Sequence, residues 1–227
     1  MPATLFAVAA SHPCAAVEVA LRMKRIPFRR VDWPPPLHKV VQRALFPGGT
    51  VPGVRFDDGE RVLGSGNILR ALDARVPEPP IVSDDPRVVE AEAWGDDVLQ
   101  KLVRRLTWVA LKARPAAMVS YAVDARPPVP APVVRALAPG VVRSQAAFND
   151  AHRDVEGDRA ALPGHLDRID AWIADGTLGG ERPNQADLQI GSSLRLALTL
   201  DEYAPQTDAR PAGALARRWF PDYPGRA

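Results

Sequence analysis

The sequence has one cysteine, Cys14, among its 227 residues. A single cysteine cannot form a disulfide within the chain and cannot supply a zinc site built from several cysteines. Long apolar runs are also missing: the longest, Leu5–Ala10, has about six residues, whereas ~20 are needed to span a bilayer. No basic segment precedes that run, so a secretory signal is not expected. These absences favour a cytoplasmic protein with no metal centre and no membrane partner.

Charge of one sign is equally scarce. The 29 Lys and Arg residues nearly balance the 27 Asp and Glu residues, which leaves a net charge of +2. Basic residues come in runs of no more than two, as at Arg29–Arg30, so binding to nucleic acid through phosphate neutralisation is not expected. What is present is typical of a globular protein, with 46% apolar and 25% charged residues. A chain of this length buries about 70% of its unfolded surface and needs no metal to fold.

The first part of the chain mixes strand and helix patterns. Short apolar, β-branched runs predict strands, a 3.6-residue period predicts helices, and the Asp-Gly pair between two apolar runs predicts a hairpin. In chain order we expect a strand Thr4–Ala9, a helix from Pro13 to before Pro27, a strand Phe28–Trp33, a short helix Leu37–Leu45, strands Val54–Phe56 and Arg61–Leu63, and a helix capped by Ser65. This order predicts an α/β domain over residues 1–77.

Strand signals disappear after the proline-rich linker that includes Pro77, Pro79 and Pro80. Residues 84–227 therefore form a second predicted domain, which is all-helical. Its expected helices are Asp85 to about Arg114, Val133–Asp154 with an interruption at Pro139-Gly140, Leu162–Ala174, and a helix from Asn184 to about Leu200. Asn184 and Asp187 have the spacing of a capping box, so we expect Asp187 to stabilise the fold and not to take part in chemistry.

Two segments of the first domain could bind a ligand. Ser11-His12-Pro13-Cys14 lies between a strand and a helix, where free backbone N–H groups and the helix dipole favour an anion. A hydroxyl there can stabilise that anion, and a thiol there can itself ionise. The ordinary alternative is a capping serine followed by a packed cysteine. Val51-Pro52 precedes a strand, and a proline at such a turn is often cis, which leaves Val51 able to pair its backbone with an extended peptide.

A third segment, Leu63-Gly64-Ser65-Gly66-Asn67, places Ser65 at a helix start, where its hydroxyl and backbone N–H could hold a carboxylate. Simple helix capping explains the same residue equally well.

The order of these motifs resembles the cytosolic glutathione S-transferase family. The segment SHPCAAVEVAL is similar to the one that carries the active-site serine in the serine-type, bacterial-like classes. The segment TVPGVRFDDGERVLGSGNIL resembles the glutathione-binding stretch, and LGGERPNQADLQIGSSLRLAL resembles the end of the helical domain with its capping box. The resemblance covers almost the whole chain.

This resemblance implies a thioredoxin-like N-terminal domain that binds glutathione as co-substrate, an all-helical domain that lines a pocket for a second, apolar electrophile, and a homodimer with a role in detoxification. Ser11 would donate a hydrogen bond to the glutathione sulfur and lower its pKa. The Val51-Pro52 segment would pair with the cysteinyl backbone, and Ser65 would hold the γ-glutamyl carboxylate. Trp108, Met118 and Tyr121 could line the electrophile pocket, although each also suits a helix–helix core.

The sequence departs from the family pattern at three glycines. Gly64 stands where an acidic residue is usual, Gly66 where a basic residue often follows the serine, and Gly49 where a polar side chain is usual. His38 and Lys39 could replace part of the lost charge recognition. Three functions therefore stay open: conjugation of glutathione or a related thiol to an electrophile, a non-catalytic ligand-binding or interaction protein, and a glutathione-dependent thiol–disulfide oxidoreductase that uses Cys14.

Overall fold

The computed structural model describes residues 2–35 and 37–227, and the side chain of residue 38 is outside the description. The described strands form one four-stranded sheet in the order β2-β1-β3-β4. The strands are β1 (Ala3–Ala7), β2 (Phe28–Asp32), β3 (Gly53–Phe56) and β4 (Arg61–Leu63). β2 pairs parallel with β1, whereas β3 is antiparallel to both β1 and β4. The predicted thioredoxin-like arrangement is thereby confirmed.

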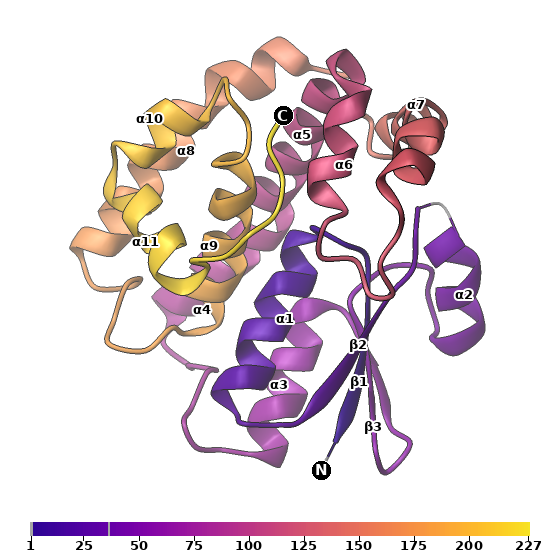
Figure 1. Ribbon diagram of the computed structural model, residues 1–227. Coiled ribbons are helices and arrows are strands. Elements are labelled where there is room, and N and C mark those ends of the chain that lie inside the picture. The colour runs from indigo at the N-terminus through magenta and orange to yellow at the C-terminus, as the bar shows by residue number, and fades with distance from the viewer. Residues whose placement is uncertain (1, 36) are drawn as a thin grey trace.

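Three helices accompany the sheet: α1 (His12–Met23), α2 (Leu37–Leu45) and α3 (Ser65–Arg75). Figure 1 shows α1 and α3 side by side on one face of the sheet and α2 away from them on the other side. The apolar faces of α1 and α3 pack on the sheet, with Leu21, Leu69 and Leu72 fully buried. The start of α1 and the turn before β3 therefore meet at the end of the sheet that faces the helical part of the chain.

The rest of the chain is helical in the described residues. Its elements are α4 (Pro86–Trp94), η1 (Gly95–Leu99), α5 (Gln100–Ala113), η2 (Pro115–Ala117), α6 (Met118–Tyr121), α7 (Ala131–Phe148), α8 (Val155–Ala174), α9 (Gln185–Ala197), α10 (Ala204–Asp208) and α11 (Pro211–Trp219). Figure 1 shows α5, α6 and α7 above the sheet, with α8 to α11 beside them. The predicted all-helical half is confirmed, while the domain limits of 77 and 84 stay predictions.

Helix α9 joins the two parts. Its residue Leu188 belongs to the same apolar core as β1, α1 and α3, while Ile190 and Leu194 belong to the core of the helical part. The predicted capping box is confirmed: the Asp187 N–H donates to Asn184 Oδ1 at 2.9 Å, and the Asn184 N–H donates to Asp187 Oδ2 at 3.0 Å. Asp187 also accepts the Gly179 N–H at 2.8 Å, so it holds the turn that precedes the helix.

The expected interruption at Pro139-Gly140 is wrong, because α7 continues through Pro139 to Phe148. A proline inside a helix removes one hydrogen bond, the one that would reach the carbonyl four residues earlier. That carbonyl belongs to Arg135, and both residues are exposed, so water can replace the lost donor. The helix also ends six residues before the expected Asp154, which instead caps α8 through the Gly157 N–H.

Candidate functional site

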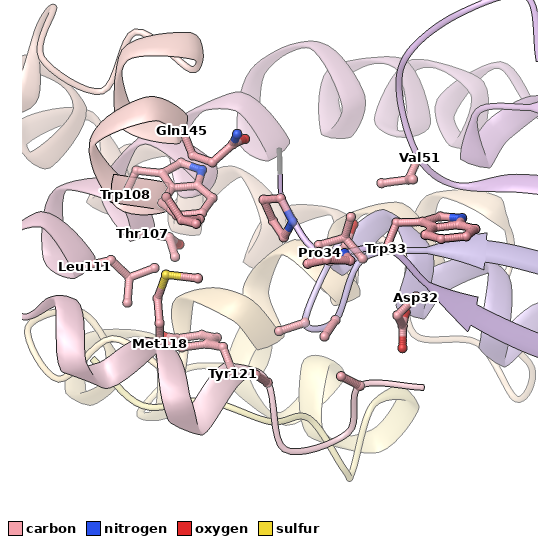
Figure 2. A pocket seen from close by; sticks show the side chains of 18 of the residues that line it. Asp32, Trp33, Pro34, Val51, Thr107, Trp108, Leu111, Met118, Tyr121 and Gln145 are labelled. Atoms are coloured by element: carbon pink, nitrogen blue, oxygen red, sulfur yellow. The ribbon is translucent and has the colours of Figure 1, made fainter. Parts of the chain in front are cut away.

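A cavity of about 280 Å³ opens between the sheet and the helical part. The loop after β1, the end of β2 and the turn before β3 form one wall, and α5, α6 and α7 form the other. Figure 2 shows Trp33, Pro34 and Val51 on the sheet side, with Trp108, Leu111 and Met118 across from them. The walls are mainly apolar, so the cavity suits an apolar ligand. A ligand in it would also lie at the ends of the strands.

Ser11 lies at this cavity and at the N-cap of α1. Its backbone is extended, with φ −76° and ψ 114°, and its N–H donates to the Val8 carbonyl at 3.1 Å. The hydroxyl makes no capping hydrogen bond, which sets Ser11 apart from Asn184. The hydroxyl interacts with the Cys14 thiol, and it lies at the cavity, where it can also contact a ligand at the positive end of the helix dipole.

Cys14 is buried one turn further along α1, with 2% of its surface exposed. Burial raises the pKa of its thiol to about 11, and interactions with the Ser11 side chain and the Val8 backbone lower it by less. Among the described residues, Cys14 is not part of the cavity wall. At neutral pH this side chain is therefore a protonated, packed thiol, which is a poor nucleophile.

The Val51–Pro52 bond is cis, which confirms the prediction. Val51 lines the cavity, and neither its N–H nor its carbonyl has a backbone partner within the described ranges. Pro52 is buried and its carbonyl accepts the Gly64 N–H at 3.0 Å. Among the described residues, the Val51 backbone thus offers one unpaired donor and one unpaired acceptor at the cavity that Ser11 also lines.

Ser65 is buried, and its hydroxyl donates to Gln189 Oε1 at 3.2 Å. The hydrogen bonds continue from Gln189 Nε2 to Asp96 at 2.9 Å, and Asp96 also accepts from Gln100 at 2.6 Å. In the described part of the chain, Ser65 does not line the cavity that holds Ser11 and Val51. The structure therefore brings Ser11 and Val51 together at one cavity. Ser65 instead takes part in a contact between the sheet and the helical part.

The predicted basic residues before the Val-Pro turn lie in α2. The backbone of His38 belongs to that helix, and its side chain falls outside the described residues. Lys39 does line the cavity, and its Nζ lies 2.9 Å from the centroid of the Phe148 ring. This contact connects α2 with the end of α7 at the cavity.

Two of the three glycines that depart from the family pattern, Gly49 and Gly66, have charged side chains close to them. A Cβ on Gly49 would lie 3.0 Å from Arg43 Nε. A Cβ on Gly66 would lie 2.9 Å from Arg70 and 3.1 Å from Glu92, and these two side chains form an ion pair at 2.6 Å.

Gly64 has φ +89°, a conformation that side-chain-bearing residues rarely adopt. Its backbone conformation therefore accounts for the glycine at this position.

Several cavity residues were not found from the sequence. His12, Trp33 and Gln145 each have a buried side-chain nitrogen with no hydrogen-bond partner among the described residues. Burial lowers the pKa of His12 well below its usual value, with a smaller contribution from Arg104, so the imidazole is neutral at pH 7. The sequence identifies these three residues as ones with polar side-chain atoms. It does not indicate that they meet at one cavity.

The three aromatic and sulfur side chains expected near an apolar pocket do line the cavity. Trp108 and Met118 are partly buried there. Tyr121 is more deeply buried, and its hydroxyl lies 2.8 Å from the Thr199 hydroxyl. Burial raises the pKa of Tyr121 to about 12, so it stays protonated at neutral pH.

Two searches of the described residues found nothing. No cluster of three or more His, Cys, Asp or Glu side chains suited to a metal ion occurs there. None of the described helices has the length and apolar character needed to cross a bilayer.

Comparison with known families gives one match: residues 5–80 match the model described as glutathione S-transferase, N-terminal domain. No curated protein matches the sequence. The matched segment contains Ser11, Val51 and Ser65, together with the sheet except for the first two residues of β1.

Solved structures extend the likeness to the whole chain. A glutathione S-transferase from Rhodospirillum rubrum is 20% identical, with a TM-score of 0.62 over 96% of this chain and 85% of that one. One from Methylobacterium radiotolerans, in complex with glutathione sulfonate, is 20% identical, with a TM-score of 0.60 over 100% and 96%. A beta-etherase from a Sphingobium strain is 16% identical, with a TM-score of 0.63 over 97% and 99%. At this identity the likeness shows the fold. The first third of the chain therefore matches the N-terminal domain of glutathione S-transferases, and the whole chain has the fold of the solved glutathione S-transferases.

Proposed function

We propose that this protein is a glutathione transferase-like enzyme that joins glutathione, or a related thiol peptide, to an apolar electrophile. The observation that carries this proposal is the placement of two groups on one mainly apolar cavity: the Ser11 hydroxyl, which makes no capping hydrogen bond, and the Val51 backbone, which has no backbone partner among the described residues. Val51 supplies the donor and acceptor that an extended peptide needs. The wall formed by Trp108, Leu111 and Met118 supplies the surface for the electrophile.

Ser11 would act on the sulfur of the bound peptide. Its O–H donates to the sulfur, and this hydrogen bond favours the thiolate over the thiol and lowers the pKa of the ligand. The N-terminal end of α1 adds a favourable interaction with the same negative charge. The neighbouring Cys14 keeps its proton at neutral pH, so its S–H can donate to Ser11 Oγ and leave the serine proton for the ligand.

The reaction itself needs no cofactor from the protein. The thiol releases its proton to solvent, and the thiolate then attacks the electrophilic carbon. With a halide as leaving group, a C–S bond forms while the carbon–halogen bond breaks, and the halide leaves with the electron pair. The cavity contributes by holding the two reactants close together in the required orientation.

The two alternatives make different demands on the site. A thiol–disulfide oxidoreductase needs a reactive thiolate, and the burial of Cys14 with its pKa of about 11 argues against that function. A non-catalytic binding protein is favoured by Ser65, whose hydroxyl is already bonded to Gln189. In the enzyme, Ser65 would have to exchange this partner for the γ-glutamyl carboxylate. Membership of the serine-type class, a homodimer, a cytoplasmic location and a role in detoxification stay predictions.

Calorimetry with glutathione, together with conjugation of glutathione to a chromogenic aryl halide, tests the proposal. The enzyme should bind the peptide and accelerate conjugation above the uncatalysed rate. Binding without acceleration would favour the non-catalytic protein. No binding of glutathione and no conjugation with it would contradict the proposal for that peptide, and the same two measurements with other thiols would then decide whether a different carrier is used.

A further inference from the structure

Gln145 is a buried amide on the apolar wall of the cavity. It lies in the last part of α7 with 4% of its surface exposed. Ala138 and Val141 precede it at helical spacing and line the same cavity. The cavity wall is mainly apolar, so an apolar residue would suit this face of the helix better than an amide.

The Nε2 atom of Gln145 is fully buried and has no hydrogen-bond partner among the described residues. Buried polar groups in proteins are almost always paired, either within the protein or with water or a ligand. An amide nitrogen can only donate. A group that occupies this part of the cavity and carries an acceptor atom would therefore satisfy Nε2, whereas a purely apolar group would leave it unpaired.

The position of Gln145 separates it from the proposed thiol site. Figure 2 shows Gln145 close to Trp108 on the helical side, whereas Val51 and Trp33 approach from the sheet side. A peptide that pairs with Val51 places its sulfur at the sheet side, near Ser11. Gln145 therefore faces the second substrate and not the thiol peptide.

We infer that Gln145 is a specificity-determining residue, which selects electrophiles that carry a hydrogen-bond acceptor, such as a carbonyl, ether or nitro oxygen, on the part that lies against Trp108. The part of the inference that concerns the choice between reacting electrophiles rests on the proposed function. The binding preference itself does not need a reaction. A site with a buried donor discriminates against a ligand that lacks the acceptor, because the donor then stays unpaired.

The test uses two benzyl halides of equal size, one with an acetyl group and one with an isopropyl group on the ring. Each kcat/KM is divided by the uncatalysed rate constant, which removes the difference in intrinsic reactivity. We expect the parent to prefer the acetyl compound by about tenfold, as one hydrogen bond of ~1.4 kcal/mol implies. Gln145→Met keeps the length of the side chain and should bring the ratio close to one, mainly through a higher KM for the acetyl compound.

Arg143→Met is the matched control, because Arg143 is exposed on the same helix and should leave the ratio as in the parent. Replacing an unpaired buried amide by a thioether should not destabilise the fold, and thermal unfolding checks this. A parent that shows no preference, or a Gln145→Met variant that keeps it, would overturn the inference.

A second measurement separates this inference from the proposed function. The corresponding benzyl alcohols cannot react, and their binding can be followed through tryptophan fluorescence, since Trp108 lies at Gln145. A preference for the acetyl alcohol that Gln145→Met removes would support the inference even if no conjugation is found. Equal binding of both alcohols to the parent would overturn it, even if conjugation is fast.

Discussion

The backbones of Asp32 and Arg126 are hydrogen-bonded to each other across the two parts of the molecule. The Asp32 N–H donates to the Arg126 carbonyl at 2.7 Å, and the Arg126 N–H donates to Asp32 Oδ2 at 2.8 Å. Arg30 Nε donates to the other carboxylate oxygen at 3.0 Å. The end of β2 is thereby fixed to the loop between α6 and α7, and both segments contribute to the cavity wall.

Asp32→Ala should destabilise the protein and loosen the cavity. The change leaves the Arg126 N–H without its acceptor and removes one of the two carboxylate partners of the partly buried Arg30, which keeps Glu18. We expect a loss of about 2–4 kcal/mol in the free energy of unfolding. Denaturant unfolding measures it. The matched control is Asp57→Ala in the exposed turn between β3 and β4, which should stay within about 0.5 kcal/mol of the parent. Equal effects of the two substitutions would show that the link between β2 and the loop contributes nothing.

Asp187→Ala should lower stability while leaving the conjugation rate of the folded protein unchanged. The substitution removes the acceptor of two backbone N–H groups, those of Gly179 and Asn184, and should cost about 2–4 kcal/mol. Thermal unfolding and kcat/KM at a temperature well below the transition are the two readouts. A variant with the parental melting temperature and no activity would mean that Asp187 belongs to the active site.

His12 should make stability depend on pH. Its pKa in the folded protein is lowered by burial and by Arg104, so below about 6.5 the unfolded chain binds a proton that the folded protein does not. Stability should therefore be fully present above pH 6.5 and decrease as the pH falls, by up to ~1.4 kcal/mol per pH unit.

His12→Gln, which cannot ionise, should make the unfolding free energy fall less steeply between pH 7 and pH 5, and His165, whose pKa burial also lowers, should account for part of the remaining slope. The same substitution at the exposed His152 serves as control and should keep the parental curve. If both variants follow the parent, the imidazole of His12 is not held neutral in the fold.

Cys14 should be inert in the folded protein. Because the thiol is buried and its pKa is about 11, a chromogenic disulfide reagent at neutral pH should modify it at least about a hundredfold more slowly than in denaturant, since only the thiolate reacts. Cys14→Ser should keep most of the conjugation activity. Rapid modification of the folded protein, with loss of activity, would instead support the oxidoreductase.

Local signals in the sequence were sufficient for much of the fold. The Asp-Gly turn predicted the β3–β4 hairpin, and Asn184 with Asp187 predicted the start of α9, because in both cases the interacting groups lie within a few residues of each other. The same local reasoning failed at Pro139, where exposure to water decides whether the helix continues. Helices α10 and α11 were not predicted at all, although Ala212 and Ala216 on α11 are fully buried.

The candidate site was predictable only in part. Ser11 and Val51 were found because each follows a recognisable motif at the end of an element. Two features of the site were not predicted. The Asp32–Arg126 link joins residues that are 94 positions apart in the sequence, and the role of Gln145 depends on the apolar cavity wall in which it lies. The contact of Ser65 with Gln189, 124 residues later, was likewise invisible from the sequence.

The pH–rate profile of Ser11→Ala tests the central claim most directly. The substitution leaves the helix start and the cavity in place and removes one hydrogen bond to a thiolate, about 1.5–3 kcal/mol. We predict that conjugation at neutral pH falls roughly ten- to a hundredfold, and that much of the loss returns at alkaline pH, where the thiol ionises without help. A variant that keeps the parental rate and profile, while Cys14→Ser is inactive, would contradict the account and assign the chemistry to Cys14.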